Sequence, residues 1–185
     1  MILLTCKPSI AQIDFSPDTA VVTSFTSRTV DSLFNLSKEV DFELRLSVNP
    51  DLLPDRELFV LSLKDDKWSF LYFEFSRDDT IFTWKEHSSA KDASGLWLCI
   101  KASNALNLRS QDELRGKEGN NLQLDLLDGV TYEFKLTNKK GKRQYYYRCP
   151  NALLKKYPEV KEFKQAAYII ESFYNFMDKA KKVRC

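Results

Sequence analysis

The side chains best suited to chemistry in this sequence are cations and tyrosines gathered in residues 139–148. The members are Lys139, Lys140, Lys142, Arg143, Tyr145, Tyr147 and Arg148. Lysine and arginine neutralise phosphates, and tyrosine rings stack on unpaired bases. One hypothesis is therefore that this segment, with a basic C-terminus formed by Lys179, Lys181, Lys182 and Arg184, binds single-stranded nucleic acid such as RNA.

A simpler interpretation of the same cations is a solvated lysine-rich turn followed, further on, by the C-terminal end of a helix. Cations suit that end of a helix because the macrodipole is negative there. The net charge is only +2, and charges of both signs are mixed along the chain. The sequence favours this interpretation, and the binding function of the segment is the alternative.

Catalytic candidates are few. His87 is the one histidine, and Glu86 precedes it, but neighbours on a strand point to opposite faces and would not meet one substrate. Cys99 or Cys149 could pair with His87 as nucleophile and base, although nothing beyond their presence supports it. The sequence contains no glycine-rich phosphate loop, GxSxG or HExxH motif. We predict no catalytic residue and no cofactor, and keep a small hydrolase using His87 as a second alternative.

The four cysteines, Cys6, Cys99, Cys149 and Cys185, are too widely spaced for the short zinc motifs. With a single histidine, no metal site is predicted. Two disulfides are possible in an oxidising compartment, but scattered cysteines are more typically buried thiols.

The N-terminus resembles the end of a lipoprotein signal peptide, with Cys6 as the residue to be acylated. The basic region and most of the apolar region of such a signal are missing. No run approaches the ~18 apolar residues that span a membrane. We expect a cytoplasmic protein, or an exported lipid-anchored one through Cys6 if the true start lies upstream.

The elements that would position these residues are mostly strands. Alternation of apolar and polar residues predicts strands at 42–48, 57–64, 68–76 and 80–86. Residues 122–149 predict three more: strand 122–127, a type I′ turn at Asp128-Gly129, strand 130–137, a turn at 138–141, and strand 142–149. Together they form an antiparallel meander.

Two helices complete the prediction. Residues 89–104 have helical spacing, although 96–100 also fit a strand, so residues 89–108 are the ambiguous region. Residues 158–181 form an amphipathic helix with Pro158 in its first turn.

The 185 residues are 43% hydrophobic, with 5 glycines and 6 prolines, which predicts one domain over 1–185 with a poorly ordered segment at 1–20. The fold class is α+β: a curved antiparallel sheet of about six to eight strands, a mid-chain helix, and a long C-terminal helix packed on the sheet. The function expected is a non-enzymatic binding or interaction domain for an unknown protein or small ligand.

Overall fold

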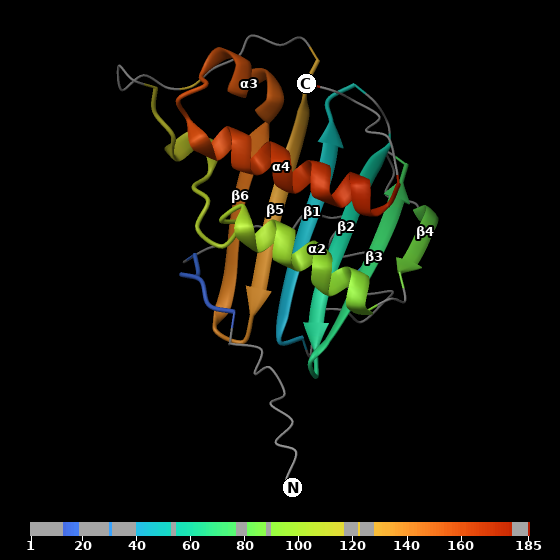
Figure 1. Cartoon of the computed structure of the whole chain (residues 1–185). Coiled ribbons are helices and arrows are strands. Elements are labelled where there is room, and N and C mark those ends of the chain that lie inside the picture. The colour runs from blue at the N-terminus through green and yellow to red at the C-terminus, as the bar shows by residue number, and fades with distance from the viewer. Residues whose placement is uncertain are drawn as a thin grey trace, which may run out of the picture.

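The chain forms an α+β fold in which helices cover one face of an antiparallel sheet (Figure 1). The computed structural model describes residues 13–18, 30, 40–52, 55–76, 81–87, 90–116, 122, 128–178 and 185. These residues contain a six-stranded sheet, the low end of the predicted range. The predicted fold class is confirmed, as are the mid-chain helix and the long C-terminal helix. The segment around Cys6 and the basic tail at 179–184 lie outside the described residues.

The first four strands form the predicted meander, and the chain then returns to the opposite side of β1. The strands are β1 (Phe42–Pro50), β2 (Arg56–Lys64), β3 (Lys67–Phe75), β4 (Ile81–His87), β5 (Val130–Asn138) and β6 (Gly141–Arg148). Their order in the sheet is β4-β3-β2-β1-β5-β6. Between β4 and β5 the chain passes through α2 (Ala90–Ala102) and a short 3-10 helix, η1 (Gln111–Glu113). Because of this crossover, β4 and β6 form the two opposite edges of the sheet.

The predicted hairpin at Asp128-Gly129 is wrong. Strand β5 is paired along both edges, with β1 on one side and β6 on the other, and residues 123–127 of the predicted strand lie outside the described residues. Gly129 also lacks the left-handed φ that a type I′ turn requires. Local turn chemistry favoured pairing with a neighbour in sequence, whereas β5 pairs with β1, whose paired residues lie 80 to 96 positions earlier.

Two other hairpin turns are well defined, and the first of them carries the left-handed backbone. Asp65 and Asp66 both have positive φ, 48° and 62°, and they join β2 to β3 as a two-residue hairpin. The second hairpin, between β5 and β6, was predicted correctly. There the side chain of Asn138 accepts hydrogen bonds from the backbone N–H groups of Lys140 and Gly141, at 2.9 and 3.1 Å.

The helices follow the predictions with shifted ends. α2 settles the ambiguous region as helix. α4 runs over Lys161–Phe176 rather than 158–181, so Pro158 precedes the helix instead of opening it. A short helix, α3 (Pro150–Lys156), comes directly after β6. Within the part of the chain that the structure describes, no helix is long and apolar enough to cross a membrane.

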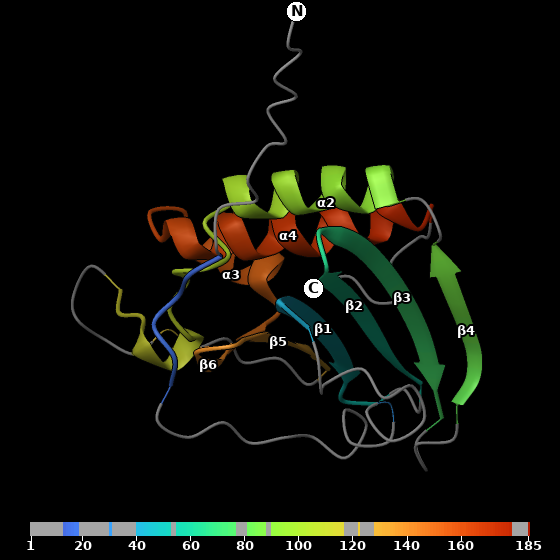
Figure 2. The same ribbon diagram turned by 90° about the horizontal axis from the view of Figure 1, so that it is seen from below.

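The main core lies between the sheet and the helices (Figure 2). Trp97 of α2 packs against Phe42 and Trp68, with ring centroids 4.8 and 5.3 Å apart. In the same way, Phe173 of α4 packs against Phe59 of the sheet, with their ring centroids 5.5 Å apart. Both helices thus bury one aromatic-bearing face and leave the other face outside.

The opposite face of the sheet is mixed. Its apolar part is a second cluster of Val30, Leu58, Val60, Leu71, Phe73 and Phe75. On β1 the same face carries Glu43 and Arg45, each 2% exposed, which form an ion pair with Nε to Oε1 at 2.6 Å. A buried charge is tolerated because its partner is beside it on the same strand.

The cysteines differ from the prediction of buried thiols. Cys149 and Cys185 form a disulfide that closes a loop of 36 residues around α3 and α4. Cys99 is a free thiol, and it is exposed on α2. The sequence could not show the pairing because Cys149 and Cys185 meet only through the packing of α3 and α4 on the sheet.

Candidate functional site

The lysines at the β5–β6 turn are each held by a carboxylate. Lys139 Nζ lies 2.6 Å from Asp41 Oδ1, and Lys140 Nζ lies 2.9 Å from Asp14 Oδ1. The hydrogen bond to Lys139, together with that from the Asp65 N–H, lowers the pKa of Asp41. Two cations of the predicted positive tip, Lys139 and Lys140, are therefore paired with carboxylates, although exposed pairs of this kind contribute little to stability.

The tyrosines behind the tip face the core instead of solvent. Tyr145 and Tyr147 are buried, and their hydroxyls donate to the backbone carbonyls of Ala105 (2.8 Å) and Arg109 (2.5 Å). Burial raises the pKa of both. Tyr146 on the other face of β6 is 39% exposed. Rings that pack in the core are not available to stack on bases.

The remaining predicted residues brace the edge of the sheet. Arg143 donates to the Leu108 carbonyl at 2.9 Å, and Arg148 pairs with Asp51 at 2.6 Å. The carbonyl of Lys142 accepts from the N–H of Asp18. The outward N–H groups of β6 donate hydrogen bonds to side chains. Gln144 donates to Asp18, Tyr146 to Ser110 and Arg148 to Gln111. Covering the edge in this way removes a template for unwanted strand pairing.

The structure thus brings the seven predicted binding residues together on one hairpin but turns the aromatic ones inward. A nucleic-acid site on this hairpin would depend on Lys139, Lys140, Lys142, Arg143 and Arg148 alone. The basic residues predicted to extend it lie outside the described residues.

The catalytic candidates lie on different elements of the fold. His87 is the last residue of β4, opposite Phe70 of β3, on an edge strand. Cys149 is in a disulfide, and Cys99 is on α2. Among the described residues, no group of three or more histidines, cysteines or carboxylates is placed to hold a metal ion.

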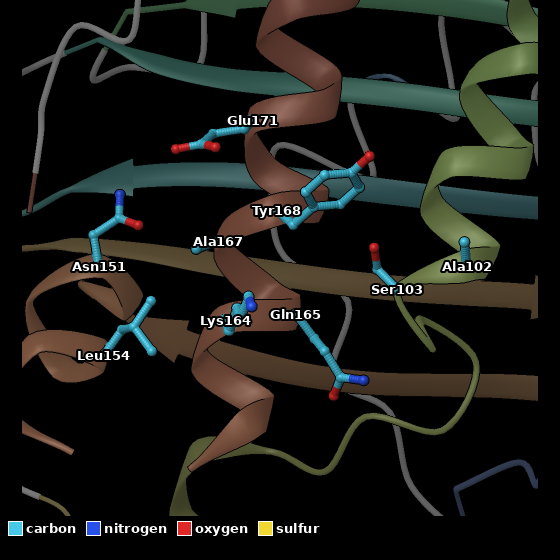
Figure 3. A pocket seen from close by; sticks show the side chains of 9 residues that line it. All are labelled: Ala102, Ser103, Asn151, Leu154, Lys164, Gln165, Ala167, Tyr168 and Glu171. Carbon is cyan, nitrogen blue, oxygen red and sulfur yellow. The ribbon is translucent and has the colours of Figure 1, made fainter. Parts of the chain in front are cut away.

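A groove of about 470 Å³ opens on the outer face of the helix layer, where α2, α3 and α4 meet (Figure 3). This volume is within the usual range of small-ligand pockets. The lining residues come from the C-terminal end of α2, from α3 and from the outer side of α4: Ala102, Ser103, Asn151, Leu154, Lys164, Gln165, Ala167, Tyr168 and Glu171.

The groove combines apolar walls with a few polar groups. Leu154 and the two alanines supply aliphatic surface, and the ring of Tyr168 stands over α4 toward α2 (Figure 3). The hydroxyl of Ser103 donates to the Cys99 carbonyl at 3.3 Å. The Oε1 atom of Gln165 is buried and has no hydrogen-bond partner. A buried acceptor without a donor costs about 1–3 kcal/mol, so it is a place where a donor from a ligand would be favoured.

The start of α4, and with it one side of the groove, is fixed by an ion pair. Glu162 is buried, and its Oε1 accepts from Arg109 Nη2 at 2.5 Å. Burial raises the pKa of Glu162, but hydrogen bonding and charge from Arg109 outweigh it, so the net pKa is lowered. The carboxylate therefore stays ionised near neutral pH and holds the helix to the segment after α2.

No sequence motif marks this groove. Its lining residues come from three helices, and the first and last of them, Ala102 and Glu171, are 69 positions apart in the sequence. No sequence motif links these residues. One signal was present in the sequence, namely an aromatic residue, Tyr168, in the middle of the polar side of an amphipathic helix.

Comparison with known proteins gives no further assignment, because no protein-family model matches the chain and no curated protein matches it either.

Proposed function

We propose that this chain is a non-enzymatic binding domain whose binding surface is the outer face of the helix layer. The groove between α2, α3 and α4 opens on that surface. The sheet serves as a rigid support, because α2 and α4 are anchored to it by aromatic side chains on their inner faces.

The observation that carries this proposal is the groove itself, with a buried, unpaired amide oxygen in its lining. Gln165 Oε1 would accept from an N–H or O–H group of the ligand. Tyr168, which is 50% exposed, would cover an apolar part of it. Pockets with mostly apolar walls and a few convergent polar groups are where proteins bind ligands.

The test is an amide-resolved NMR titration of the full chain with a library of small amides, carboxylates and aromatic amines, combined with a dilution series. We expect shifts that cluster on Ser103, Asn151, Gln165 and Tyr168. The variant Ala102→Trp should abolish them, since Ala102 is exposed and a larger side chain there fills the groove without disturbing the core.

A matched control is Leu52→Trp, which adds the same ring at a residue that is 65% exposed on the β1–β2 connection. It should bind as the unmodified chain does. If no compound and no change in concentration shifts the groove amides, the proposal is wrong.

A further inference from the structure

We infer that the partner at this face is a second copy of the chain, docked with its α4 antiparallel to α4 about a two-fold axis at Tyr168. The inference rests on the proposed function, since it assigns an occupant to the same surface.

The exposed side of α4 is a single stripe. Its members are Lys161, Lys164, Tyr168, Glu171 and Asn175, at steps of three and four residues, and every one is exposed. The positions between them are buried or half-buried. Residues at these steps lie on one side of a helix, so the stripe faces outward as a unit.

The charges in this stripe are separated by sign. The two lysines precede Tyr168, and the carboxylate follows it. At about 1.5 Å of rise per residue, Lys164 lies roughly 6 Å before Tyr168 along the helix axis and Glu171 roughly 4.5 Å after it. A copy laid antiparallel on the same axis therefore places Lys164 opposite the partner's Glu171, and Glu171 opposite the partner's Lys164. Two-fold interfaces require self-complementarity of this kind.

The order of these charges runs against the helix macrodipole. The macrodipole favours carboxylates near the N-terminus and cations near the C-terminus, the reverse of what the stripe shows. Lys164 and Glu171 are also seven residues apart, beyond the three or four at which helical side chains pair. An antiparallel partner helix turns the unfavourable order into a favourable one, because its dipole and its charges both run the other way.

Apolar surface lies beside the charged stripe. Tyr168 is 50% exposed, and Leu98 on the neighbouring α2 is 66% exposed. Figures 1 and 2 both show α2 and α4 side by side on the same face of the sheet. The groove adjoining Tyr168 gives the partner's Tyr168 a place to pack. An apolar centre with charges around it is the usual anatomy of a protein interface.

The test is sedimentation equilibrium of the full chain at low and high salt, with charge reversals on α4. We expect a concentration-dependent dimer that weakens with salt. Lys164→Glu alone and Glu171→Lys alone should each weaken the dimer at least ~10-fold, because each places like charges opposite one another at two symmetric positions.

Two combinations make the result specific. The double variant K164E/E171K should dimerise again, because reversing both charges restores the match. An equimolar mixture of the two single variants should form a heterodimer although neither self-associates. Lys67→Glu, an exposed charge on the β2–β3 turn, is the control and should leave the dimer unchanged.

A chain that stays monomeric at millimolar concentration, or single variants that do not complement one another, would overturn the inference. If the chain is monomeric but groove amides still shift with a small compound, the binding proposal survives and only the identity of the partner is wrong. If neither occurs, both fail.

Discussion

Glu57 is the residue whose surroundings most constrain its role. It is 4% exposed, and it accepts hydrogen bonds from the hydroxyls of Tyr72 on β3, at 2.7 Å, and Tyr174 on α4. A buried carboxylate is stable only when donors replace the water it has lost. The three side chains therefore join the C-terminal half of α4 to the centre of the sheet.

We expect Tyr174→Phe to lower the free energy of unfolding by about 1–3 kcal/mol, since it removes a donor from a buried carboxylate without removing the ring. Urea unfolding followed by circular dichroism would measure the change. Tyr168→Phe is the matched control on the exposed side of the same helix and should change stability little. Equal stability of the two variants would show that Glu57 does not need the Tyr174 hydroxyl.

At the scale of an element, the β2–β3 turn carries avoidable strain. Asp66 has φ of 62°, in the left-handed region that favours glycine. We expect Asp66→Gly to raise the free energy of unfolding by about 0.5–1 kcal/mol. Lys67→Gly, one residue later at the start of β3, should lower it. Urea unfolding measures both variants. If Asp66→Gly lowers the free energy of unfolding, the backbone at Asp66 is not strained.

The α3–α4 unit is tied at its two ends by the Cys149–Cys185 disulfide. Closing a loop of 36 residues restricts the unfolded chain, which is worth about 3–4 kcal/mol in the chain-entropy account. Cys185→Ser should lose that stability, and added dithiothreitol should then have no further effect. Cys99→Ser changes an exposed free thiol and should keep the full response to reductant. If the urea midpoint of the wild-type chain does not change when dithiothreitol is added, the disulfide does not stabilise the fold.

For the whole molecule, the pH dependence of stability follows from buried tyrosines. Burial raises the pKa of five of them: Tyr72, Tyr132, Tyr145, Tyr147 and Tyr174. For Tyr132 the pKa rises from 10.0 to about 12. The unfolded chain then loses these protons at lower pH than the folded one. The stability that they contribute is complete below pH 10 and is lost as the pH rises toward and beyond 12.

Each such tyrosine should lower the free energy of unfolding by about 1.4 kcal/mol per pH unit between its unfolded and folded pKa. Urea unfolding at a series of alkaline pH values would show a steep fall starting near pH 10. Tyr132→Phe should make that fall shallower by one such contribution. Stability that stays level through this range would mean that the hydroxyls reach solvent in the folded state.

The fold class and most of the elements could be predicted from local patterns in the sequence. The strand alternation at 42–48 and 57–64, the helical spacing at 89–104 and the apolar stripe of 158–181 all became elements of the predicted type, because burial of one face dictates the period of apolar residues. The basic hairpin was also found. What it could not show was that its tyrosines point inward and its lysines meet Asp14 and Asp41.

Which elements are neighbours could not be predicted from the sequence. Pairing of β5 with β1, the Cys149–Cys185 bond and the groove between α2, α3 and α4 all join residues far apart in the chain. Local patterns carry no information on such contacts, because an edge strand or an exposed helix face looks the same whichever partner it meets. The choice is made by how the whole core packs, and packing is a property of all elements at once.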